Sequence, residues 1–158
     1  MNKKLHPSLL ELWNYFILCN QEHKNTPIPE SYYFCDNEKD ANTCAQLVVD
    51  GVKRATSTSM WWFETYKQPL PKIGDLAIVT DWDGIAKAVI ETVKIEMTPF
   101  NKVTAEYAKI EGESDKSLAY WNKVHWNYYT REMIKHGEQP SEDMLLVCEY
   151  FRTVCVRD

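Results

Sequence analysis

The chain has 158 residues and a mass of 18.5 kDa, the size of one domain that can bury its own core. Its net charge of −5 and pI near 5.4 argue against a broadly basic protein that binds nucleic acid through many phosphate contacts. Five cysteines without a CxxC pair and four scattered histidines indicate neither a disulfide framework nor a metal site, and we expect no cofactor. Because the sequence has no signal peptide and no long apolar run, we expect a cytoplasmic protein without a membrane partner.

Two helices are predicted in the first third of the chain. Residues 7–22 carry a proline near the start and an apolar stripe at helical spacing, formed by Leu9, Leu12, Trp13, Phe16 and Ile17. The prolines in residues 25–36 predict an extended connector. A second helix follows, with Asp36 or Asn37 as its N-cap and Gly51 beyond its end.

The clearest strand pattern lies in the middle of the chain. Residues 75–80 and 85–95 are apolar, β-branched runs, and the Asp83–Gly84 pair between them is typical of a hairpin turn. Residues 103–112 then predict a short helix that stops at a glycine.

The last part of the chain predicts a long helix and a strand. Residues 115–137 form an amphipathic pattern with Asp115 or Ser117 as the cap. Residues 143–156 are apolar, β-branched and aromatic, which is typical of a central strand. Together the elements predict one α+β domain over residues 1–158, with a small sheet or barrel between helices.

Two glutamates fall on apolar faces of the predicted strands. Glu91 shares its face with valine and isoleucine side chains, and Glu149 shares its face with leucine, valine and phenylalanine side chains. Such a carboxylate is costly unless it is paired, hydrogen-bonded or protonated, so it is a candidate site residue. The alternatives are a partly solvated face or a structural bridge to a lysine or arginine.

The long helix places His125, Tyr129 and Glu132 near one face, at spacings of four and three. This histidine is a candidate site residue because its ordinary pKa lies near neutrality. A single histidine between aromatic side chains is more often a packed, hydrogen-bonded core residue, and from the pattern alone that reading is favoured.

The segment DGVKRATSTSMWW, residues 50–62, combines two cations, four hydroxyl side chains and two tryptophans. Lys53 and Thr56 are three apart, so a straight strand would point them to opposite faces. If a bend after Gly51 brought them together, a lysine in a dry pocket could act as a base for the threonine hydroxyl. The alternative, favoured by spacing alone, is a helix end with Lys53 and Arg54 near its dipole and a hydroxyl-rich strand start.

Four stretches resemble the ASCH-domain family of the PUA-like superfamily, specifically its longer bacterial type. They are GVKRATSTS, VIETVKIEMTPFNKV, EYAKIEGESDKSLAYWNKVHWNYYTRE and SEDMLLVCEYFRTV, in the family's order and within roughly residues 30–155. The resemblance implies a PUA-like small mixed β-barrel with helices packed around it. It also implies a cleft lined by the lysine–threonine loop, with the helix over 7–22 as an extension.

The resemblance also implies a chemistry. Small members of the family hydrolyse the amide of N4-acetylcytidine, and the match assigns Lys53 as proton acceptor, Thr56 as nucleophile and Glu111 as proton donor. Glu113 lies close enough in the alignment to be the alternative donor. We expect the pocket around them to be shaped by Arg54, Ser57, Trp61, Trp62, Glu91, Trp121, His125, Arg131 and Glu149. The tryptophans offer stacking surfaces, and the partner is a nucleoside-like small molecule or single-stranded RNA.

Two other functions remain open at this stage. PUA-like folds often bind RNA or modified nucleosides without turnover, and a fold does not decide a function. A second class of the family includes a metal-assisted ribonuclease acting on single-stranded RNA. Its residues transfer to Lys53 and, for a hydroxyl before an Arg-Glu pair, to Thr130.

Overall fold

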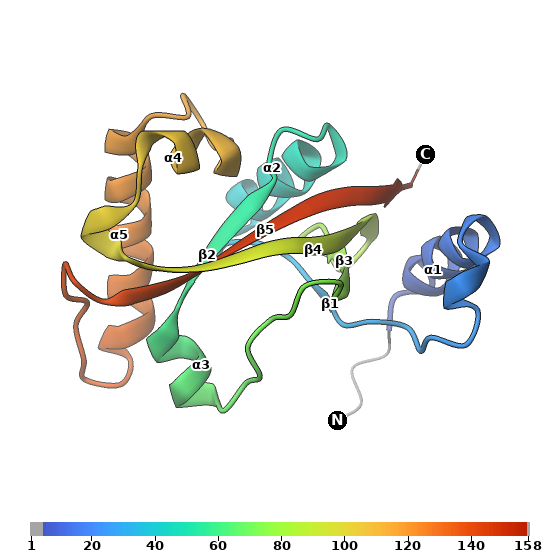
Figure 1. Ribbon diagram of the computed structural model, residues 1–158, viewed down its shortest axis with the longest axis horizontal. Coiled ribbons are helices and arrows are strands. Elements are labelled where there is room, and N and C mark those ends of the chain that lie inside the picture. Colours follow the sequence, from blue (N-terminus) through green and yellow to red (C-terminus); the bar gives the residue numbers. More distant parts are fainter. Residues whose placement is uncertain (1–4, 158) are drawn as a thin grey trace. The chain divides into compact units, whose positions relative to one another are not determined.

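The computed structural model describes residues 5–157, which form five α-helices and one mixed five-stranded sheet (Figure 1). The predicted α+β class is confirmed. The strand order is β1-β3-β4-β5-β2, with β1 parallel to β3 and the β3–β4 and β2–β5 pairs antiparallel. The strands are β1 (Ser31–Tyr32), β2 (Ala55–Ser59), β3 (Leu76–Thr80), β4 (Ala86–Pro99) and β5 (Leu145–Val156). Among these residues β1 and β2 are the two edges and do not pair, so closure into a barrel stays a prediction.

The backbone divides into two compact units, which are described separately below. Unit 1 comprises the described parts of Met1–Gly51, Gly74–Glu91 and Arg152–Asp158, and unit 2 comprises Val52–Ile73 and Thr92–Phe151. Strands β4 and β5 contribute residues to both units. The organisation of the chain as one domain stays a prediction.

Unit 1 is built around helix α1 (Pro7–Cys19), whose apolar stripe packs on the sheet. The imidazole of His6 accepts the backbone N–H of Ser8 and so caps the first turn. The stripe Leu9, Leu12, Trp13 and Phe16 is at most 3% exposed and packs with Ile78, Ala86 and Val89 of β3 and β4. The helix ends three residues before the predicted boundary, because a short 3₁₀ turn, η1 (Gln21–His23), follows it.

Two further predictions about unit 1 are confirmed. Helix α2 (Glu38–Val49) begins at the predicted cap Asn37, whose side chain accepts the backbone N–H of Asp40. The β3–β4 hairpin turns at the predicted place, where the carboxylate of Asp81 accepts the backbone N–H groups of Asp83 and Ile85.

Unit 2 contains the long helix and an element that the sequence did not predict. Helix α3 (Met60–Tyr66) begins directly after β2, because the side chain of Ser59 accepts the backbone N–H of Trp62. The same serine therefore ends a strand and caps a helix. The two tryptophans, Trp61 and Trp62, therefore lie in the first turn of a helix.

Helices α4 (Ala105–Glu111) and α5 (Leu118–Ile134) lie side by side in unit 2 (Figure 1). The predicted cap Ser117 is confirmed, since its side chain accepts the backbone N–H of Tyr120. Gly112 ends α4 at a φ of +74°, and a Cβ there would lie 2.6 Å from the carbonyl oxygen of Val52. The core beneath these helices is strongly aromatic and includes Phe100, Tyr107, Trp121 and Tyr129.

Candidate functional site

Burial alternates strictly along the chain at the start of β2. Lys53 and the strand residues Ala55, Ser57 and Ser59 are buried, whereas Arg54, Thr56 and Thr58 are exposed or half-buried. An alternation of period two is that of a straight extended segment. The bend that would bring Lys53 and Thr56 over one substrate is therefore not formed, and Thr56 lies on the opposite face from Lys53.

Lys53 is nevertheless in an unusual place for a lysine, because its side chain is only 1% exposed. Its Nζ donates to Glu113 Oε1 at 2.7 Å and to the carbonyl oxygen of Ala55 at 3.0 Å, and lies 3.5 Å from Glu111 Oε1. Glu111 is equally buried. An ammonium ion between two carboxylates offsets the cost of burying all three charges, so the resting amine is held in its charged form.

Glu111 is the centre of this cluster. Its Oε2 accepts a hydrogen bond from Ser57 Oγ at 3.1 Å and another from the indole N–H of Trp121, and it lies 3.3 Å from His125 Nε2. Burial by itself raises the pKa of this carboxyl, but the positive charges of His125 and Lys53 and the hydrogen bonds lower it to about 2. Glu111 is therefore a carboxylate at neutral pH.

His125 completes the charge balance. Its ring stacks on Trp121 with centroids 4.1 Å apart, its Nδ1 lies 2.9 Å from the carbonyl oxygen of Trp121, and its Nε2 faces Glu111. Both nitrogens face acceptors, which favours the doubly protonated ring. Burial lowers the pKa of His125, but the charges of Glu111 and Glu113 raise it more, so the net shift is upward. Two cations and two carboxylates thus balance in one buried cluster.

Two tyrosines connect this cluster to β2. The hydroxyl of Tyr107 donates to the carbonyl oxygen of Thr56, and that of Tyr129 donates to the carbonyl oxygen of Ser57, both at 2.9 Å. Burial, followed by the charge of Glu111, raises the pKa of both phenols well above their ordinary value, so they remain neutral donors. Sequence reasoning did not assign Tyr107 to the site. The spacing of four between Trp121, His125 and Tyr129 marks the face of α5 that carries the cluster.

The other predicted site residues lie elsewhere. Glu149 accepts a hydrogen bond from Thr92 Oγ1 at 2.5 Å, and the strand register places it directly opposite Thr56. Thr56 therefore shares a sheet face with Glu149. Glu91 belongs to unit 1 and forms an ion pair with Arg152 there, at 2.6 Å and 2.8 Å, which is the structural bridge weighed as an alternative.

The cations and tryptophans of the prediction have other contacts. The indole N–H of Trp61 donates to Glu138 Oε2 at 2.9 Å, and Trp62 packs on Tyr66. Arg54 is exposed, and the guanidinium of Arg131 lies over the ring of Tyr128. The Thr130 hydroxyl, assigned by the ribonuclease comparison, donates to the carbonyl oxygen of Trp126 within α5. The site thus contains five predicted residues, which are Lys53, Ser57, Glu111, Trp121 and His125, and also the alternative donor Glu113.

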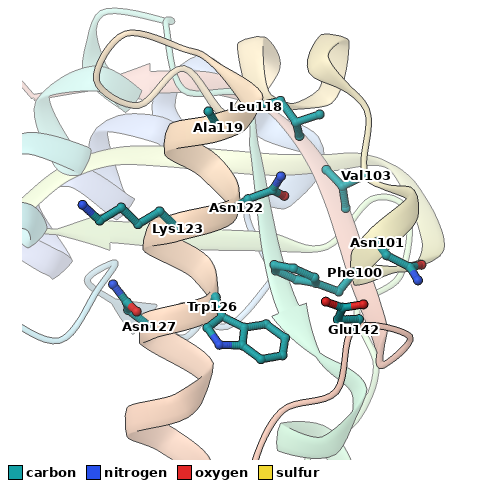
Figure 2. A pocket seen from close by; sticks show the side chains of 10 residues that line it. All are labelled: Phe100, Asn101, Val103, Leu118, Ala119, Asn122, Lys123, Trp126, Asn127 and Glu142. Carbon is teal, nitrogen blue, oxygen red and sulfur yellow. The ribbon is translucent and has the colours of Figure 1, made fainter.

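A separate groove of about 630 Å³ opens beside α5, next to the residues between Phe100 and Val103 (Figure 2). Phe100 contacts Trp121 on one side and Trp126 of the groove on the other, with centroids 5.5 and 5.3 Å apart. One layer of aromatic rings therefore separates the groove from the buried cluster. Within residues 5–157 no three histidine, cysteine, aspartate or glutamate side chains gather in a way suited to a metal ion, and no helix has the length and apolarity to cross a membrane.

Comparison with known proteins identifies relatives over most of the chain. A sequence profile of the ASCH domain matches residues 30–155. The chain is 33% identical to an ASCH domain from Lactobacillus crispatus JV V101, with a TM-score of 0.89 and 98% of each chain covered. It is 32% identical to a DUF984 protein from Enterococcus faecalis V583, with a TM-score of 0.84, covering 94% of this chain and 89% of the other. No curated protein matches the chain.

Proposed function

The chain belongs to the ASCH-domain family, which is generally thought to bind RNA, and from that premise we propose that it hydrolyses an amide on an acylated nucleoside. The observation that carries this proposal is the pairing of Lys53 with Glu111. These are the residues that the family resemblance assigns as proton acceptor and proton donor, and their charged atoms lie 3.5 Å apart in a buried setting. Perturbed, buried charge pairs of this kind are enriched at active sites.

The resting charges of the pair are the reverse of those that the reaction needs. The ion pair has Lys53 as ammonium and Glu111 as carboxylate, whereas catalysis needs an amine and a carboxylic acid. One proton passing from lysine to glutamate converts the first state into the second without changing the number of protons bound. Because both side chains are already buried, a bound substrate would favour the neutral state by drawing Glu113 away from Lys53, which leaves the buried ammonium with less compensating charge.

With the amine and the acid in place, the proposed reaction has two steps. A hydroxyl gives its proton to Lys53 and attacks the acyl carbonyl, while the leaving nucleoside amine takes the proton of Glu111. Water then hydrolyses the acyl ester, which releases the carboxylic acid and restores the hydroxyl. The family resemblance assigns the hydroxyl to Thr56. Ser57 is the alternative hydroxyl, because it is buried like Lys53 and its Oγ donates to Glu111 at 3.1 Å.

A direct assay separates these roles. The protein is incubated with N4-acetylcytidine and the release of cytidine is measured for the parent and for Lys53→Ala, Glu111→Gln, Thr56→Ala and Ser57→Ala. We expect the first two to lose about 10²- to 10⁴-fold in rate, and the two hydroxyl variants to differ from each other. Lys109→Ala is the matched control, because this exposed lysine lies on α4 outside the cluster. Release that is unchanged in Lys53→Ala contradicts the proposal.

Binding without turnover is the second candidate, and the completeness of the cluster favours it. No buried side-chain nitrogen or oxygen in the described chain lacks a hydrogen-bond partner, so the cluster is stable without chemistry. This function predicts salt-sensitive binding of short single-stranded RNA that weakens when Lys53, Arg54 or Arg131 is replaced. Intact RNA after incubation separates binding from ribonuclease activity, and chelator-sensitive cleavage would support the ribonuclease instead.

A further inference from the structure

Helix α5 carries two neighbouring stripes with opposite properties. Trp121, His125 and Tyr129 repeat at a spacing of four and face the buried cluster, where their polar atoms are hydrogen-bonded. Leu118, Asn122 and Trp126 repeat at the same spacing and line the groove. Figure 2 shows Asn122 and Trp126 projecting toward Phe100, Val103 and Glu142. Neither the buried cluster nor the proposed hydrolysis accounts for the stripe formed by Leu118, Asn122 and Trp126.

Four polar side chains of the groove have no hydrogen-bond partner among the described residues. Within residues 5–157 the amides of Asn101 and Asn122, the carboxylate of Glu142 and the indole N–H of Trp126 make no side-chain hydrogen bond. By contrast, the polar side-chain atoms of Trp121, His125 and Tyr129 on the neighbouring stripe are hydrogen-bonded. Donors and acceptors that converge on one hollow beside an aromatic ring are typical of a ligand site.

The backbone fixes the wall of the groove. The N–H of Phe100 donates to the carbonyl oxygen of Met144 at 2.9 Å, and that of Asn101 donates to the carbonyl oxygen of Glu142 at 2.8 Å. Phe100 itself is buried between Trp121 and Trp126. The Asn101 and Glu142 side chains therefore project from two segments that are tied together, so little ordering is needed when a ligand binds.

We propose that this groove binds a nucleobase with an exocyclic amino group, within single-stranded RNA, through stacking on Trp126 and hydrogen bonds to Asn122 and Glu142. An ionised carboxylate is an acceptor only and suits an amino group such as that of cytosine, whereas an asparagine amide pairs with a base edge as donor and acceptor. A half-buried indole offers a stacking face. The carboxylate of Glu142 disfavours a phosphate beside it, whereas Lys123, which also lines the groove (Figure 2), offers a cation to a neighbouring phosphate of the strand.

The groove is distinct from the proposed hydrolytic site, and the assignment does not depend on turnover. It concerns a second contact, one aromatic layer away from Glu111, that would let the protein distinguish an RNA strand from a free nucleoside. If the groove does not bind RNA, the roles proposed for Lys53 and Glu111 in hydrolysis are not affected. If the protein does not hydrolyse N4-acetylcytidine, the groove can still bind RNA.

The test uses 5′-labelled ten-nucleotide oligocytidylate and oligouridylate RNA, with fluorescence anisotropy of the full chain as the readout. We expect the parent to bind oligocytidylate at least fivefold more tightly than oligouridylate. Trp126→Ala and Asn122→Ala should each weaken oligocytidylate binding about tenfold, a loss within the range measured for single stacked bases. Glu142→Gln should remove most of the preference for cytosine, because the amide no longer offers only acceptors.

Controls separate the groove from folding and from exposed positions elsewhere. Trp126→Phe keeps a stacking ring, so it should retain most of the binding if Trp126→Ala fails only through loss of the ring. Asn14→Ala, an exposed helical asparagine of unit 1, and Glu106→Gln, an exposed glutamate of α4, should bind like the parent. Lys109→Ala, an exposed lysine of α4, should keep the cytosine preference. Free cytidine should compete only at concentrations far above those of the oligonucleotide.

Four results would overturn the assignment or one of its contacts. The first is a parent that binds neither RNA, and the second is equal binding of both RNAs by the parent. The third is groove variants that bind as tightly as Asn14→Ala while the cytosine preference persists, which would place the RNA elsewhere. A preference that survives Glu142→Gln removes the proposed contact to the amino group.

Discussion

The two sides of α5 in unit 2 differ in how their polar groups are used. Toward Glu111, the charges are balanced, and every buried side-chain nitrogen and oxygen of the described residues has a hydrogen-bond partner. Toward Glu142, four polar side chains line a hollow without hydrogen-bond partners among the described residues. A completed buried network stabilises the fold and changes only when all of its members respond, whereas an open polar groove is available to a ligand at little structural cost. Substitutions that break each side in turn test this contrast.

The largest expected effect is on the side of the cluster. Glu111→Ala leaves Lys53 and His125 as buried cations without their shared carboxylate, so we expect the free energy of unfolding to fall by about 3–5 kcal/mol. Urea denaturation at pH 7 measures it. Replacing the pair together, as Lys53→Met with Glu111→Leu, should cost less than Glu111→Ala, because the one remaining cation, His125, is then balanced by the one remaining carboxylate, Glu113. A double variant as unstable as the single one would show that this ion pair is not the source of the loss.

The pH dependence of stability isolates the same carboxylate. The folded pKa of Glu111 lies at about 2, below its ordinary value of 4.5, so its contribution is fully present above 4.5 and is lost as the pH falls through 2. The shift corresponds to roughly 3 kcal/mol over that window. We expect denaturation series between pH 6 and pH 2 to show a shallower acid decline in Glu111→Gln than in the parent. If the free energy of unfolding falls equally steeply with decreasing pH in both proteins, Glu111 does not control the loss of stability in acid.

Gly112 tests how the end of α4 positions the cluster. Both Gly112 and Gly137 have positive φ values, +74° and +72°, but only at Gly112 would an added Cβ meet backbone, 2.6 Å from the Val52 carbonyl oxygen. We expect Gly137→Ala to cost about 1 kcal/mol from the left-handed conformation alone. Gly112→Ala should cost about 1–3 kcal/mol more, because the backbone contact cannot relax without displacing Glu111 or Glu113. Similar melting curves for the two variants would contradict the close approach.

The smallest effect on stability is expected in the groove. Asn122→Ala removes an exposed side chain without a protein partner among the described residues, so its free energy of unfolding should stay within about 0.5 kcal/mol of the parent. Chemical denaturation of Asn122→Ala and of Glu111→Ala under the same conditions compares the free energies of unfolding lost on the two sides of α5. A loss above about 2 kcal/mol for Asn122→Ala would show that the groove residue is structural.

Local patterns in the sequence predicted most of the elements. The apolar stripe of α1, the Asn37 and Ser117 caps and the turn before β4 each depend on residues a few positions apart, and all were found. Helix α3 was missed because Ser59 serves as both strand end and helix cap, and three adjacent aromatic residues carry no amphipathic period. Its boundary is decided by packing in the folded chain.

The site was predictable only in part for a related reason. Lys53 and Glu111 were identified through the family resemblance, and His125 through its place on a helix face. The pairing of Thr56 with Lys53 assumed a bend that the alternating burial of β2 does not contain. The contribution of Ser57, Glu113 and Tyr107 depends on how α4 meets β2, which no spacing within one segment encodes.

The protonation of His125 tests the balanced cluster most directly, by heteronuclear NMR of its ring nitrogens between pH 5 and pH 9. The account predicts that both nitrogens carry protons beyond the ordinary pKa of 6.5, and that the titration moves downward in Glu111→Gln. A pKa of His125 at or below 6.5, or a pKa that is the same in Glu111→Gln as in the parent, would contradict the balanced cluster.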